Sequence, residues 1–260
     1  MPGTEVHRLT STQNNVDYEL RVWLPHGYDK GENSFALTVL LDADYQFPLA
    51  VSILEHLAGR GQADDSIIVA IGYKDSARNP DGYRRNRTRD YTPTAVASGG
   101  YGPQYQRFSG GAPAFLNFVT DEMMPFLMAN YRISAERRTF VGHSFGGLFG
   151  AYVLSEAADL FSSYILISPS LWYDDRLLIK TARKETLREF AQPVKVYLAV
   201  GGHENQSGQP MVDELELYAG ALRAQEQKQL QLTVRVFENE THASIYPIAL
   251  SAALRHLRSR

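Results

Sequence analysis

Cysteine is absent from this chain of 260 residues. Its absence excludes a disulfide framework, a zinc–thiolate site and a cysteine nucleophile. It does not identify the compartment, because a cysteine-free protein is stable in either redox environment. The compartment has to be inferred from other features of the sequence.

Long apolar runs are also missing. No stretch approaches the roughly 18 uninterrupted apolar residues that a membrane-spanning helix needs. The first residues, MPGTEVHRLTSTQNN, contain no apolar signal-peptide core. We therefore expect a cytoplasmic protein without a membrane span, or a periplasmic or secreted one if a signal peptide was removed from this chain.

The excess of charge of one sign is small. The net charge is −3 and charged residues make up 21% of the chain, which predicts no nucleic-acid partner. The hydrophobic content of 44% is typical of globular proteins and sufficient for a sizeable core. Because α/β folds of this length often form one domain, we expect a single domain over residues 1–260.

Short apolar segments predict the strands of that domain. Val16–Leu24 alternates apolar and polar residues, which indicates a half-buried antiparallel strand near a sheet edge. The other predicted strands are Phe35–Leu41, Ile67–Ile71, Thr139–Val141, Tyr164–Ile167, Val194–Val200 and Leu230–Phe237.

Helical patterns lie between several of these runs. They cover Ala114–Tyr131 with a kink at Pro125, and also Gly147–Ala157, Val212–Gln227 and Ile245–Leu257. Strand–helix alternation predicts an α/β fold with a mainly parallel sheet covered on both faces. Residues 74–113 show no convincing strand or helix, so we expect a long irregular loop at the active site there.

The segment Thr139–Gly147 contains a G-x-S-x-G motif centred on Ser144. In this motif the serine occupies a strained turn between a strand and a helix, and the flanking glycines let the two backbones pass closely. Its hydroxyl projects over the carboxyl edge of the sheet. The backbone N–H of Phe145, at the helix N-terminus, can stabilise an oxyanion. Ser144 is therefore the candidate nucleophile of an α/β-hydrolase fold.

A serine nucleophile needs a base and an acid that orients the base. In this fold the chain order is serine, acid, histidine, and His242 follows the last predicted strand. Glu204 lies between them, in the loop after Val194–Val200. Its carboxylate could accept the Nδ1–H of His242, although Glu238 and Glu240 are also close to His242 in sequence.

At these residues the chain resembles the putative-esterase branch of the α/β-hydrolases. This branch includes S-formylglutathione hydrolases, mycolyltransferases of the antigen 85 type and siderophore esterases. The strongest resemblance is to the IroE-like hydrolases, which cleave enterobactin-type trilactones. The matching stretches are Val39–Asp42, Arg89–Pro93, Arg138–Leu148, Ile167–Trp172 and Thr241–Ser244.

The resemblance implies further roles for residues of this chain. The second oxyanion donor should be the backbone N–H of Asp44, with its carboxylate pointing away from the oxyanion. Some siderophore esterases work with a Ser–His dyad, so the resemblance leaves open whether Glu204 is required. No metal or organic cofactor is implied, and a ferric ion would arrive only as part of a siderophore substrate.

A basic cluster between residues 84 and 89 is the candidate specificity element. Arginine pairs with oxyanions and stacks on aromatic rings, so the cluster suits an anionic or catecholate ester; a solvated or internally paired loop is the alternative. The candidate substrate-binding residues are Arg84, Arg85, Arg89, Tyr91, Trp172 and His143.

Three functions remain open at this point. The first is hydrolysis of a carboxylic ester or lactone through an acyl-enzyme, with a siderophore trilactone as the first candidate substrate. The second is acyl transfer of the mycolyltransferase type, in which an alcohol replaces water. The third is a non-catalytic binding module on the same fold, which the intact Ser144 and His242 argue against.

Overall fold

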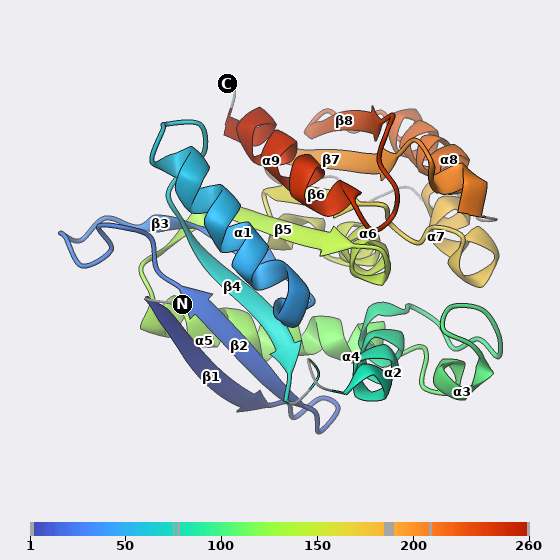
Figure 1. Ribbon diagram of the computed structural model, residues 1–260, viewed down its shortest axis with the longest axis horizontal. Coiled ribbons are helices and arrows are strands. Elements are labelled where there is room, and N and C mark those ends of the chain that lie inside the picture. Colours follow the sequence, from blue (N-terminus) through green and yellow to red (C-terminus); the bar gives the residue numbers. More distant parts are fainter. Residues whose placement is uncertain (1–2, 75, 77–78, 185–189, 208–209, 259–260) are drawn as a thin grey trace.

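The computed structural model describes residues 3–74, 76, 79–184, 190–207 and 210–258. In these ranges eight strands form one sheet, in the order β1-β2-β4-β3-β5-β6-β7-β8 (Figure 1). Strands β3 to β8 run parallel to one another, and β2 is antiparallel to both β1 and β4. The prediction of a mainly parallel sheet with an antiparallel strand near one edge is confirmed.

The strand bounds match the apolar runs of the sequence closely. They are β1 Thr4–Thr10, β2 Asp17–Trp23, β3 Phe35–Leu40, β4 Ser66–Tyr73, β5 Ile133–His143, β6 Ser163–Ile167, β7 Val194–Gly201 and β8 Leu230–Phe237. Every residue of β4 and β6 is buried, as expected for central strands covered on both faces. The edge strand β1 alternates exposed and half-buried residues and lacks an apolar run, which explains why the sequence did not indicate it.

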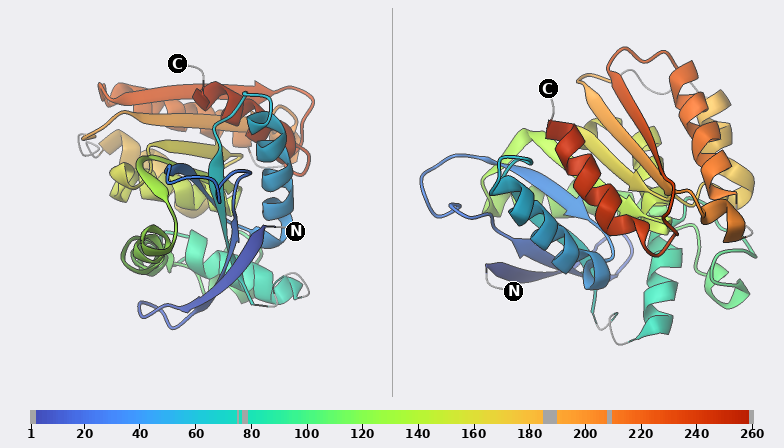
Figure 2. Two further views of the ribbon diagram at one scale, coloured as in Figure 1. Left: turned by 90° about the vertical axis from the view of Figure 1, so that its left-hand side faces the viewer. Right: turned by 45° about the horizontal axis from the view of Figure 1, so that its top comes forward.

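Helices cover both faces of the sheet, as predicted (Figure 2). One face is covered by α1 (Ala43–Ala58) and α9 (Ile245–Arg258), which bury a cluster that includes Phe47, Val51 and Leu250. On the other face lie α4 (Ala112–Asn117), α5 (Met124–Asn130), α6 (Phe145–Glu156), α7 (Tyr173–Lys184) and α8 (Met211–Ala224). No helix within the described ranges is both long enough and apolar enough to cross a membrane.

The expectation of an irregular segment over residues 74–113 is wrong. It contains α2 (Pro80–Tyr91) and α3 (Pro103–Gln106). The buried face of α2 is polar, with Arg87, Thr88 and Asp90, so apolar periodicity could not reveal it. The start signals were present, because the Asn79 side chain accepts the N–H of Gly82 and Pro80 occupies the first turn.

The predicted helix with a kink at Pro125 is present but divided. A π-helical turn, Phe118–Met123, separates α4 from α5, and Pro125 lies at the start of α5. Proline lacks an N–H and its ring clashes with the carbonyl four residues earlier, so a wider turn before it relieves both problems.

Candidate active site

The turn from β5 to α6 has the geometry that the G-x-S-x-G motif predicts. Ser144 has φ 60° and ψ −120°, a region that non-glycine residues rarely occupy. A Cβ atom on Gly142 would lie 2.2 Å from the carbonyl oxygen of Gly146, so glycine is required for the strand and the helix to pass. The turn places Ser144 at the carboxyl edge of the sheet, with the N-terminus of α6 beside it.

Glu204 and His242 meet at the same edge, although 38 residues separate them. Glu204 follows β7 and His242 follows β8, and the ends of these parallel strands are adjacent (Figure 1). The Nδ1 atom of His242 lies 2.6 Å from Oε2 of Glu204. A Cβ on Gly201 would lie 2.4 Å from the Glu240 carbonyl oxygen, so glycine allows the two loops to approach.

The other carboxylate oxygen of Glu204 accepts two hydrogen bonds. Its Oε1 accepts the hydroxyl of Ser168 at 2.6 Å and the backbone N–H of Gly201 at 2.7 Å. The Glu204 side chain is 1% exposed, whereas that of His242 is 43% exposed. Of the nearby acids, Glu240 instead accepts the hydroxyl of Ser244. The carboxylate that contacts His242 is therefore also held from the opposite side.

Ser144 and His242 do not share a hydrogen bond in this structure. The hydroxyl within reach of Ser144 Oγ is that of Ser170, 3.5 Å away. Such contacts are often long in the absence of substrate and tighten in the complex. His143, the residue before Ser144, lies close to His242, with ring centroids 4.6 Å apart.

The candidate oxyanion donors, Phe145 and Asp44, lie at the starts of α6 and α1. Asp42 adopts a left-handed conformation, φ 54°, and turns the chain sharply from β3 into α1. The carboxylate of Asp44 lies 2.6 Å from an Arg21 nitrogen and accepts the Ser76 hydroxyl. The negative charge of Asp44 is thus compensated by Arg21 on β2 and by Ser76, which follows β4.

A buried ion pair beneath this turn involves two residues that the sequence did not single out. Arg87 donates Nε–H and Nη2–H to the two carboxylate oxygens of Asp42, at 2.8 and 3.0 Å. Arg87 also donates to the carbonyl oxygen of His143 at 3.2 Å and to the Tyr101 hydroxyl. One guanidinium therefore ties the β3–α1 turn to the residue that precedes Ser144.

The environment of Arg87 is aromatic and almost fully buried. Its guanidinium carbon lies 5.2 to 5.9 Å from the ring centroids of Tyr83, Tyr91, Tyr101 and Phe145. Burial by itself would lower the pKa of Arg87, but Asp42 raises it well above its ordinary value. The sign of Arg87 in the sequence was the arginine-rich run itself. Which arginine of that run is buried depends on the helix that carries it, and the sequence did not indicate this helix.

We expect Arg87→Met to lower the free energy of unfolding by about 3–5 kcal/mol, because it leaves the Asp42 carboxylate buried and unpaired. Chemical denaturation of both proteins measures the loss. Arg84→Met on the same helix is the matched control, because Arg84 is 46% exposed, and its effect should stay within about 0.5 kcal/mol. Equal stability of Arg87→Met and wild type would contradict this account.

Comparison with known proteins decides the family. The model of the family described as "Putative esterase" matches residues 11–256. The chain belongs to this esterase family. The ferri-bacillibactin esterase BesA of Bacillus subtilis is 30% identical over 263 residues, which cover 98% of the esterase described here and 89% of BesA.

Two further relatives agree with this assignment. The siderophore enterobactin esterase of Emericella nidulans is 28% identical over 276 residues, covering 94% of this esterase and 88% of the relative. The crystal structure of an IroE-like serine hydrolase from Shewanella oneidensis superimposes with a TM-score of 0.82 at 30% identity, covering 98% and 79% of the two chains. The expected resemblance to IroE-like hydrolases and the α/β-hydrolase fold are both confirmed.

Five of the six predicted substrate-binding residues of the esterase fall into two groups, and the sixth, His143, lies against the ring of His242. Trp172 packs against Phe145 with ring centroids 5.8 Å apart, and Arg84 and Arg85 lie on the surface of α2 over Tyr105 and Phe108. The remaining two turn away from the surface, and the structure corrects their assignment. Arg89 is paired with buried Asp90 at 2.7 Å, and Tyr91 is fully buried.

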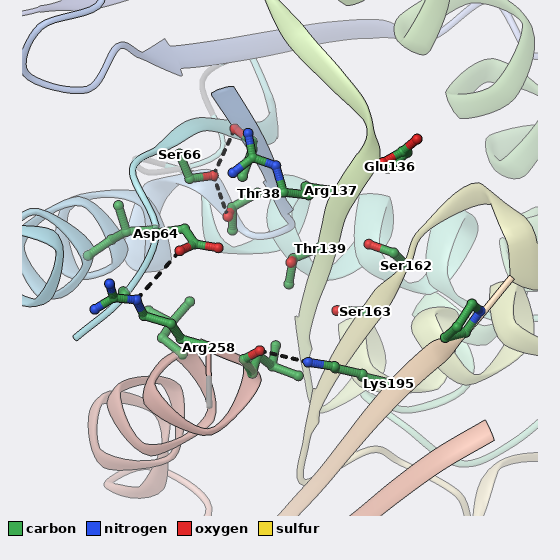
Figure 3. Close-up of a pocket in the computed structure, with 16 residues that line it drawn as sticks. Thr38, Asp64, Ser66, Glu136, Arg137, Thr139, Ser162, Ser163, Lys195 and Arg258 are labelled. Atoms are coloured by element: carbon green, nitrogen blue, oxygen red, sulfur yellow. Dashed lines mark hydrogen bonds and ion pairs between the residues drawn. The ribbon is translucent and has the colours of Figure 1, made fainter. Parts of the chain in front are cut away.

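A cavity of about 360 Å³ lies at the opposite edge of the sheet, among the amino ends of β3 to β7 (Figure 3). Four of its five charged side chains, Asp64, Arg137, Lys195 and Arg258, have partners within the protein. Arg258 lies 3.6 Å from Asp64, and Lys195 donates to the Leu257 carbonyl at 2.9 Å. Ser144, Glu204 and His242 all lie at the carboxyl edge, so this cavity is separate from the candidate active site.

Proposed function

We propose that this esterase is a serine hydrolase that cleaves its ester through an acyl-enzyme on Ser144. The contact that carries the proposal is the 2.6 Å approach of the Glu204 carboxylate to Nδ1 of His242. An acceptor at Nδ1 keeps the proton there, so that Nε2 is free to take the hydroxyl proton of Ser144. The strained turn at Ser144 presents that hydroxyl at the same edge.

Each group has a defined role in the reaction. Ser144 Oγ attacks the ester carbonyl while His242 accepts its proton, and the imidazolium then protonates the leaving alkoxide. The backbone N–H groups of Phe145 and Asp44 hydrogen-bond the oxyanion. Water, activated by His242, hydrolyses the acyl-enzyme and restores Ser144.

The substrate we propose is a siderophore-type trilactone. Two lines of support are the names of the relatives, a ferri-bacillibactin esterase and a siderophore enterobactin esterase. A third is the proposed rim of the site, where Arg84 on α2 lies over the ring of Tyr105 and Arg85 over that of Phe108. Guanidinium groups and flat rings are suited to anionic, aromatic ligands.

The direct test is turnover of ferric and iron-free trilactone siderophores, with simple p-nitrophenyl esters in parallel. We expect lactone opening, with the mass of the product increased by one water per bond, and a fluorophosphonate adduct on Ser144 in the intact protein. Transfer of the acyl group to an added alcohol in preference to water would indicate an acyltransferase. Absence of both turnover and adduct would indicate a binding module.

The rim makes a separate prediction about specificity. Replacing both surface arginines, Arg84→Ala/Arg85→Ala, should lower kcat/KM for a catecholate trilactone about tenfold or more, since each should contribute about 1 kcal/mol to binding. The rate on a neutral p-nitrophenyl ester should not change. Arg223→Ala, at an exposed position on α8, is the matched control for loss of positive charge. Equal losses on both substrates would mean that the two arginines do not recognise the ligand.

A further inference from the structure

His143 is inserted between the candidate base and the helix that follows it. Its ring centroid lies 4.6 Å from that of His242, with 34° between the planes, and 6.0 Å from that of Tyr246 in an edge-on arrangement. His242 and Tyr246 are four residues apart, on the loop that leads into α9 and on its first turn. The residue directly before Ser144 thus fills the space behind His242.

His143 is well fixed on its own side. It is the last residue of β5 and pairs with Ile167 of β6, and its carbonyl accepts the Arg87 hydrogen bond. Burial, with smaller effects from His242 and Arg87, lowers the pKa of His143 to about 3. The groups that face it from the surrounding elements are His242, Arg87 on α2 and Tyr246 on α9. Its ring is therefore neutral throughout the pH range in which an ester hydrolase operates.

His242 is less firmly held than the carboxylate that orients it. Its side chain is 43% exposed, and Glu204 contacts one edge of the ring at Nδ1. A contact at one ring atom sets a distance but leaves the ring plane free to tilt. A flat neighbour against the ring face restricts that tilt, and an uncharged neighbour does not oppose the imidazolium that forms during the reaction.

We propose that His143 is a positioning residue: its uncharged ring packs against His242 and aligns that imidazole with Ser144. The proposal rests on the proposed function, since it assigns a role toward the base of that reaction. It replaces the prediction that His143 binds substrate. It also explains how Ser144 and His242, which are 98 residues apart, keep their relative placement. His143, directly before Ser144, is itself the surface against which His242 packs.

The test compares two replacements that separate the properties of the imidazole. His143→Phe keeps a flat, uncharged ring, whereas His143→Gln keeps a hydrogen-bond donor without the ring. We expect His143→Gln to lower kcat for a p-nitrophenyl ester about 100-fold with KM within about twofold, because small misplacements of a base are costly. We expect His143→Phe to remain within about threefold of wild type in kcat, with an unchanged acid limb in its pH profile.

Leu215→Ala is the control for a general loss of stability, because Leu215 is fully buried on α8 and has no role assigned in the site. It should lower the unfolding temperature without changing kcat at 25 °C. Loss of activity in His143→Phe with retention in His143→Gln would assign the role to hydrogen bonding and overturn the proposal, as would unchanged kcat in both. Wild-type protein that neither turns over esters nor reacts with a fluorophosphonate would instead contradict the proposed function itself.

Discussion

Replacing Ser144 with alanine should abolish ester hydrolysis, with kcat falling by about 10⁶-fold, as when the nucleophile of other serine hydrolases is removed. Without Oγ no acyl-enzyme can form, and only weak acceleration by the oxyanion donors remains. Folding should be almost unaffected, because alanine preserves the Cβ atom and the φ of 60° at the turn. Initial rates on a p-nitrophenyl ester and the thermal unfolding midpoint measure the two quantities.

Ser170→Ala is the matched control, since the Ser170 hydroxyl is 3.5 Å from that of Ser144 and is buried at the same edge. It should keep both the fluorophosphonate adduct and measurable turnover. If the adduct persists in Ser144→Ala and disappears in Ser170→Ala, the nucleophile is Ser170 and the assignment to Ser144 is wrong. The pair of variants therefore separates the elbow serine from its nearest hydroxyl neighbour.

Replacing Glu204 with glutamine should lower kcat by about 10² to 10⁴-fold with little change in KM. Ser168 and the N–H of Gly201 both donate to Oε1, so the glutamine carbonyl should take that position. The amide NH₂ would then face Nδ1 of His242. Nδ1 must accept, the proton moves to Nε2, and the imidazole can no longer take a proton from Ser144. Steady-state kinetics on an activated ester measures the effect.

Glu240→Gln controls for the loss of an acidic group near the same loop, because Glu240 binds Ser244 and not His242. Its rate should equal that of wild type. A Glu204→Gln variant as fast as wild type would show that Ser144 and His242 suffice as a dyad, and the close contact between Glu204 and His242 would then be structural. The ratio of kcat between Glu240→Gln and Glu204→Gln thus measures how much the orientation of His242 by Glu204 contributes to the rate.

Apolar strands and backbone-constrained turns were predictable because their signals are local. The predicted strands were found with ends that differ by at most six residues, since each is a short apolar run bounded by turn residues. The turn at Ser144 was identified because only glycine is tolerated at Gly142. Chain order then indicated His242 and Glu204, because the ends of β5, β7 and β8 share one edge of a parallel sheet.

Polar burial was not predictable from local pattern. Helix α2 was missed because most of the residues that it buries are polar. Arg87, Thr88 and Asp90 are among them, and a periodicity argument reads such residues as exposed. The same absence of signal led to Arg89 and Tyr91 being placed at the site, whereas one pairs with Asp90 and the other lies in the core. Whether an arginine binds substrate or a buried carboxylate depends on partners up to tens of residues away.

The sequence by itself determined the parallel strands of the sheet and the strained turn at Ser144, because hydrophobic periodicity and glycine sterics act over a few residues. It also predicted Ser144, Glu204 and His242, in that chain order, as candidate nucleophile, acid and base. Only the tertiary structure decided that Arg87 pairs with Asp42 beneath the turn and that His143 lies against His242. A buried charge is stable when the fold brings an opposite charge next to it, and that partner can lie anywhere in the sequence. The contacts of a side chain across strands likewise depend on how distant segments pack.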